Sequence, residues 1–166
     1  PIVDGLLQDA RKGLAIDPQR IQLTARLLSE VSADPDLFRR LSQVDGDVTF
    51  RADRQDPGGP AAINWPISSG AIIDTERRSR AEVWVGSTAY RLAGNSRAEF
   101  VTVDDRRVNL QLATGTLAVT IRDRNQADDL EIETPEGRIR FTGAGRYRTE
   151  AGSDRTTVAA QSGAAE

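Results

Sequence analysis

The side chains that most often carry out catalysis are absent from this sequence or occur only once. It contains no histidine and no cysteine, which removes imidazole bases, thiolate nucleophiles and the metal sites that depend on these groups. Lys12 is the only lysine and lies in the N-terminal part, so serine–lysine hydrolysis is disfavoured as well. The composition therefore predicts a protein that is not an enzyme and needs no cofactor.

Carboxylates are the remaining candidates for metal binding or acid–base chemistry. Four side chains in one short stretch offer oxygen ligands for calcium: Asp123, Asn125, Asp128 and Asp129. Their spacing is not that of an EF-hand and the loop glycine is missing, so a polar hairpin loop is expected instead. Glycoside hydrolysis needs two carboxylates across a cleft, and nothing in the sequence pairs Glu82 with Glu99. We predict no metal site and no catalytic residue.

An aromatic residue offers a binding surface rather than chemistry. Trp84 is out of phase with Val83 and Val85, so we expect it on the solvent face of its strand, beside Glu82. An exposed tryptophan is a common contact for a protein partner or a glycan. The alternative is that N-terminal helices or a second sheet cover it. Trp84 and Glu82 are therefore the candidate contact residues.

The elements that must position these residues are strands. Apolar and polar side chains alternate most clearly in four segments: 108–112, 117–121, 130–133 and 138–141. A period of two places one set of side chains in a core and the other in water, as in antiparallel sheets with one wet face. Glycines punctuate many short segments of this kind. We predict an all-β domain whose short antiparallel strands form a two-sheet roll or a short β-helix-like sandwich.

Two turns predict the register of their hairpins. Gly86-Ser87 has the form of a two-residue turn and predicts two pairs: Val85 with Thr88, and Val83 with Tyr90. In Thr134–Gly137, proline presets the second position and Gly137 is expected to supply a positive φ. Closing that turn gives three pairs: Glu133 with Arg138, Glu131 with Arg140, and Ile132 with Ile139. Charge pairing on one face and aliphatic pairing on the other agree on this register.

The first 41 residues have a different pattern. Asp17-Pro18 is a good helix start, because a carboxylate stands at the N-cap and proline at the first position. The stretch 19–32 then places most of its apolar residues along one stripe. We expect a small α-helical segment over 1–41, followed by a β domain over 42–166. The helices pack on the domain, simply precede it, or dock a partner.

Charge and hydropathy restrict the partners. The 22 basic and 25 acidic residues are interleaved and give a net charge of -3. Nucleic acid is not expected as a partner, because phosphate binding needs a clustered basic face. No segment approaches the roughly 20 apolar residues that cross a bilayer, so no membrane span is expected in this chain.

Several pieces in one order carry a resemblance to a known family. They are Val44–Val48, Trp65–Gly70, Asp74–Thr75, Ser79–Val83, Leu110–Leu117, Ile132–Pro135 and Gly143–Arg148, followed by Thr157–Val158 and Gly163–Ala164. Each piece consists mostly of residues that are common in turns. In their order and spacing, however, the pieces resemble the FecR-type domain, named after the ferric-citrate regulator of Gram-negative bacteria. The resemblance covers residues 42–166.

The resemblance implies a β-rich periplasmic domain. In the transmembrane members of that family, such a domain senses an outer-membrane receptor and relays its state to a sigma factor. Residues 1–41 do not resemble the cytoplasmic anti-sigma segment, and no span precedes the domain, so the chain is more similar to the exported, soluble branch. We expect a periplasmic or secreted protein with a protein partner in the cell envelope. A glycan or peptidoglycan is the alternative ligand, and the family offers no catalytic residues.

Overall fold

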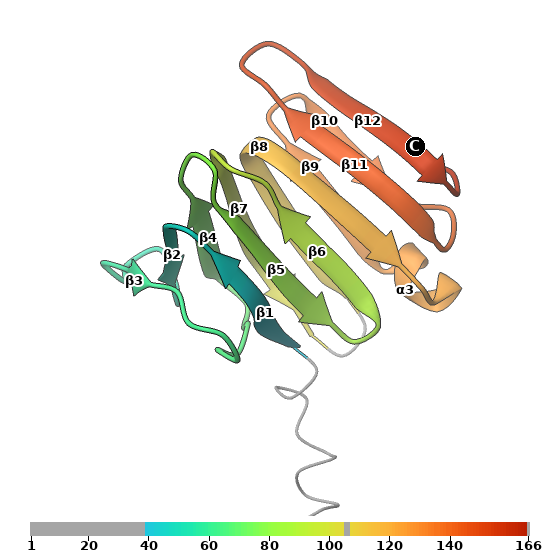
Figure 1. Cartoon of the computed structure of the whole chain (residues 1–166). Helices are drawn as coiled ribbons and strands as arrows, with labels where there is room; N and C mark the ends of the chain where they lie inside the picture. Colours follow the sequence, from blue (N-terminus) through green and yellow to red (C-terminus); the bar gives the residue numbers. More distant parts are fainter. Residues whose placement is uncertain (1–38, 105–106, 166) are drawn as a thin grey trace, which may run out of the picture. The chain divides into compact units, whose positions relative to one another are not determined.

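One long strand organises the domain in the computed structural model, which describes residues 39–104 and 107–165. Strand β8 (Val108–Ile121) has 14 residues and belongs to two sheets (Figure 1). Gly115 lies where the strand passes from one sheet to the other, and its φ is +92°. A Cβ at this position would lie 2.5 Å from Ser96 Cα. Glycine is therefore required at the bend, for its φ and for the space.

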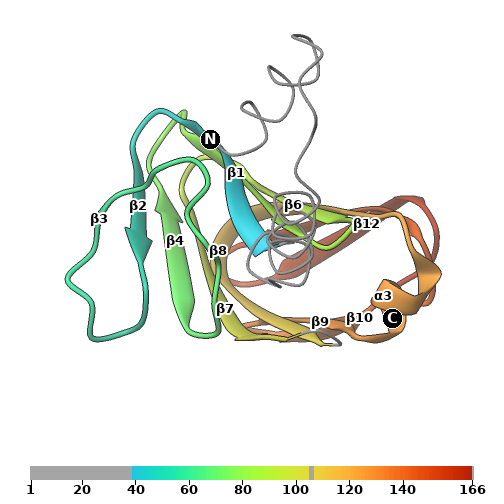
Figure 2. The ribbon, with the colours of Figure 1, turned by 90° about the horizontal axis from the view of Figure 1, so that it is seen from below.

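The two sheets share β8 and are otherwise separate. Sheet A consists of β1 (Arg39–Asp45), β5 (Arg80–Val85), β6 (Thr88–Leu92), the second part of β8, β11 (Gly145–Ala151) and β12 (Thr156–Ser162), in that spatial order. Sheet B consists of β3 (Gly59–Pro60), β2 (Val48–Arg51), β4 (Ala71–Thr75), β7 (Ser96–Val103), the first part of β8, β9 (Leu130–Thr134) and β10 (Gly137–Arg140), in that spatial order. Figure 2 shows the two sheets as facing layers. The two-sheet β architecture that the alternation predicts is thus confirmed.

The core lies between the layers. Side chains of the alternating segments are buried as predicted, among them Leu110, Leu117 and Ile132, each with no exposed surface. Tyr90 of sheet A meets Phe100 of sheet B edge to face, with ring centroids 5.7 Å apart. Aromatic contacts of this geometry add to the apolar burial that holds the layers together.

Both predicted hairpin registers are confirmed. Val85 pairs with Thr88 and Val83 with Tyr90 across the first turn. Across the second turn, the three pairs are those predicted: Glu133 with Arg138, Ile132 with Ile139, and Glu131 with Arg140. The predicted positive φ of Gly137 is wrong, because the glycines with positive φ in the described residues do not include it. A two-residue loop between the paired Thr134 and Gly137 closes this hairpin without it.

One strand pair contradicts the expectation of a purely antiparallel sheet. Strands β8 and β9 are parallel, with Val108 opposite Leu130. Parallel neighbours usually need a long crossover, but here β8 bends at Gly115. A short linker therefore returns the chain to the start of β8, where the Val108 N–H donates to the Asp129 carbonyl at 3.0 Å.

Two further expectations concern segments without strands. The predicted polar loop near Asp123 contains the short helix α3 (Arg124–Asp128), which Asp123 caps by accepting from the Asn125 N–H at 3.0 Å. The predicted N-terminal helices lie outside the described residues. Strand β1 begins at Arg39, three residues before the predicted domain boundary.

Candidate interaction surface

The described strands leave four sheet edges, at β1, β3, β10 and β12. An edge strand exposes unpaired backbone groups, and folded proteins usually cover, shorten or charge such edges. The edge of β1 is covered by residues 64–67. The Leu41 N–H donates to the Trp65 carbonyl at 2.9 Å, and the Leu41 carbonyl accepts from Asn64 N–H at 2.7 Å. This edge is therefore covered along its first three residues, Arg39–Leu41.

The two edges of sheet B are protected in other ways. Strand β3 has only two residues and ends at Pro60, which has no N–H to donate. Strand β10 has four residues, and Arg138 and Arg140 alternate along it. Charged side chains on a short edge oppose the addition of another strand.

Strand β12 has none of these protections. It has seven residues of sequence TTVAAQS, without a charged side chain. Within the described part of the chain its only neighbouring strand is β11. Six of its seven residues are exposed, including Val158 with 40% of its surface in contact with solvent. Apart from Thr156, whose hydroxyl bonds Thr134 and Glu136 of the β9–β10 hairpin, both faces of β12 and its outer edge are therefore open.

Glu82 organises the solvent face of sheet A near β5. Its carboxylate accepts from the Trp84 indole N–H at 2.5 Å and from the Ser42 hydroxyl at 3.0 Å, and forms an ion pair with Arg91. Burial of the carboxyl acts to raise the pKa of Glu82, but these hydrogen bonds and the charge of Arg91 outweigh it. The pKa therefore lies below its ordinary value.

Trp84 lies on the solvent face, as its phase along β5 predicts, and it is half-buried. The guanidinium of Arg122 lies over its ring, 4.9 Å from the centroid, which is a cation–π contact. One ring face and the indole N–H are therefore already engaged. This arrangement gives no support to a glycan stacked on Trp84, and a partner contact at Trp84 and Glu82 stays a prediction.

Four arginines surround a depression of about 540 Å³ on the same face. We call it the arginine trough: Arg91 from β6, Arg122 after β8, and Arg146 and Arg148 from β11. The small residues Ala118 and Thr120 of β8 lie between them. Ala118 pairs with both Arg91 and Arg148, and Thr120 pairs with Arg146.

The trough was not predicted from the sequence. The alternation of Arg146 and Arg148 around the buried Tyr147 is the signal that could have shown two of its members. The other two come from strands that are distant in the sequence. Their meeting depends on β6 and β11 flanking the same part of β8.

The family model described as FecR protein matches residues 71–166, which is more than half of the chain. The chain belongs to the FecR family. No curated protein and no solved structure matched it. The matched part of the FecR domain begins at β4 and contains the whole trough and β12.

Family membership indicates a role in cell-envelope signalling or regulation, and the family is typically associated with the envelope. No helix in the described part of the FecR domain has the length and hydropathy needed to cross a bilayer.

The carboxylates considered for catalysis are not brought together in the FecR domain. Glu82 lies on the outward face of sheet A and Glu99 on that of sheet B, where it binds Arg54 at 3.0 Å. Within the described ranges no three metal-ligating side chains converge. Asp123 serves as the cap of α3, so its side chain has a structural role there.

Proposed function

We propose that this FecR-family domain is a non-enzymatic recognition module of the periplasm or secreted space, which binds a protein by adding a partner strand to β12. The observation that carries the proposal is the exposure of β12 on both faces, in a sequence without charge. A strand added there would continue the hydrogen-bond ladder of sheet A, which is a common mode of peptide recognition.

The other edges and the chemistry of the chain support the same function. The edges at β1, β3 and β10 are covered, short or charged, so β12 is the open edge among the described strands. The chain has no imidazole or thiol, and Glu82 and Glu99 are both used in ion pairs. Recognition therefore fits these residues better than bond chemistry does.

The test compares two exposed valines. Val158 lies on the open strand β12, whereas Val101 lies on the interior strand β7, with 40% and 37% of their surfaces exposed. Val158→Lys places a charge on the edge and should prevent strand addition. Val101→Lys adds the same charge where no edge is available, and serves as the matched control.

Each full-length variant is immobilised and exposed to an extract of a Gram-negative envelope. We expect wild type and Val101→Lys to retain the same protein and Val158→Lys to lose most of it, with all three equally folded by circular dichroism. Equal retention by the two lysine variants, or no retention by the wild type, would reject the proposed function.

A further inference from the structure

One face of β12 lies on the solvent face of sheet A, and positively charged side chains lie next to it. Arg146 and Arg148 lie next to it on β11, and their partners on β12 are small: Ser162 opposite Arg146, and Ala159 opposite Arg148. Strands are spaced about 4.8 Å apart, so an added strand would lie about 10 Å from β11. Because the intervening side chains are small, the long arginine side chains can reach across β12 toward its open edge.

The positive charge at this edge is poorly neutralised. Arg148 lies 3.7 Å from Glu150, and both side chains are more than half exposed, so this pair is weak. Among the described residues no carboxylate forms an ion pair with Arg146 or Arg122. In sheet B, by contrast, Arg140 binds Glu131 at 2.9 Å and Arg51 binds Asp74 at 2.7 Å. Arg91 is bound to Glu82, and the other three arginines leave the trough with positive charge that attracts anionic groups.

The opposite side of β12 is apolar. Val158 and Ala160 pair with Thr149 and Tyr147, whose side chains point into the core. Yet Val158 and Ala160 are themselves exposed, because β12 extends beyond the layer that covers β11. An added strand would thus meet arginines on one face and small apolar side chains on the other.

Resting on strand addition at β12, we propose that the partner strand is amphipathic, with carboxylates at alternate positions toward Arg146 and Arg148 and apolar residues toward Val158 and Ala160. Charge complementarity of this kind selects partners and raises association rates. A second copy of the chain is a poorer occupant, because pairing β12 with itself would bring two rows of arginines onto one face. Like charges placed there oppose association.

The test uses two labelled seven-residue peptides, one alternating Glu and Val and one alternating Lys and Val, titrated with the full chain by fluorescence anisotropy. We expect the Glu peptide to bind at least about tenfold more tightly than the Lys peptide, a difference of about 1.4 kcal/mol, because attraction to Arg146 and Arg148 replaces repulsion. Binding should weaken as salt is raised. The variant Arg146→Glu/Arg148→Glu should reverse the preference.

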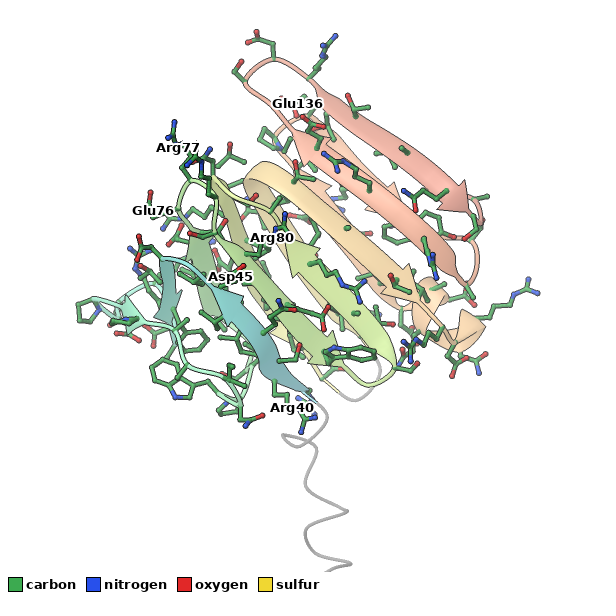
Figure 3. The ribbon with its side chains drawn as sticks, in the orientation of Figure 1. Arg40, Asp45, Glu76, Arg77, Arg80 and Glu136 are labelled. Carbon is green, nitrogen blue, oxygen red and sulfur yellow. The ribbon has the colours of Figure 1, made fainter. Side chains whose placement is uncertain are left out.

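The matched control is Arg77→Glu/Arg80→Glu, which makes the same change of charge at two exposed arginines away from β12 (Figure 3). Arg77 lies between β4 and β5, and Arg80 is the first residue of β5. It should keep the preference for the Glu peptide. If the reversal variant binds the Glu peptide as well as the wild type does, or if both peptides bind equally, the acidic partner is wrong. The proposal of strand addition still holds in that case if Val158→Lys abolishes binding.

Two other results would also overturn the acidic strand. In the first, the wild type binds phosphatidylglycerol vesicles and not the Glu peptide, and Arg146→Glu/Arg148→Glu abolishes the binding to vesicles. In the second, sedimentation velocity shows a concentration-dependent dimer of the wild type, and Val158→Lys abolishes it. That result would mean that a second copy of the chain occupies the edge. Neither result is expected, and loss of partner capture in Val158→Lys remains the separate test of the proposed function.

Discussion

Glu82 joins three elements of sheet A through a single carboxylate. Its partners come from β1, β5 and β6: Ser42, Trp84 and Arg91. The sequence predicted that Trp84 and Glu82 share the solvent face, because period two is a local property of one strand. It did not predict that Arg122 covers the indole ring, because that contact joins residues far apart in the chain.

At this scale we predict that Glu82→Gln lowers the free energy of unfolding by about 1 kcal/mol at neutral pH, through the weakened bonds to Arg91 and Trp84. The folded pKa of Glu82 is depressed. The contribution is therefore fully present above the pKa of about 4.3 of an unfolded glutamate, and is lost as pH falls through the lower folded value. Urea unfolding from neutral to acid pH measures it. A difference between wild type and variant that persists unchanged at the acid end would contradict this assignment.

The strands of the domain follow from the alternation of apolar and polar residues, which can be seen in the local sequence. Hairpins 83–90 and 131–140 were predicted in register, because a short turn and matched side chains fix the pairing. The parallel pairing of β8 and β9 was not predicted, because it depends on the bend at Gly115, which carries the second part of β8 into the other sheet. Helix α3 was also missed, since five residues with one cap carry little periodic signal.

At the scale of secondary-structure elements, the bend of β8 at Gly115 leads to a prediction about stability. Gly115→Ala combines a positive φ with a clash against Ser96, and should lower the free energy of unfolding by about 2 kcal/mol or more. Gly137→Ala is the control. Gly137 lacks a positive φ and has nothing within 4 Å of an added Cβ. Urea unfolding should show Gly137→Ala within about 0.5 kcal/mol of wild type, and equal losses in the two variants would show that the bend does not need glycine.

At the scale of the whole molecule, the described strands leave β12 as the sheet edge that is neither covered, short nor charged. The openness of β12 on both faces was not predicted, because it depends on how far the facing sheet extends, and the alternation of residues along one strand carries no information on that. The arginine trough likewise depends on β6, β8 and β11 lying side by side. Because the trough lies next to the open edge, the proposed recognition of charge and of backbone would take place on one surface of this FecR-family protein.

Hydrogen–deuterium exchange of the full chain, with and without the Glu peptide or the captured protein, tests strand addition most directly. A partner strand would hydrogen-bond the outward backbone groups of β12, so exchange should slow across Thr156–Ser162, with little change in β1, β3 and β10. Protection centred on the loop that carries the exposed Ile63 and Trp65, with β12 exchanging as in the free protein, would contradict recognition through this edge.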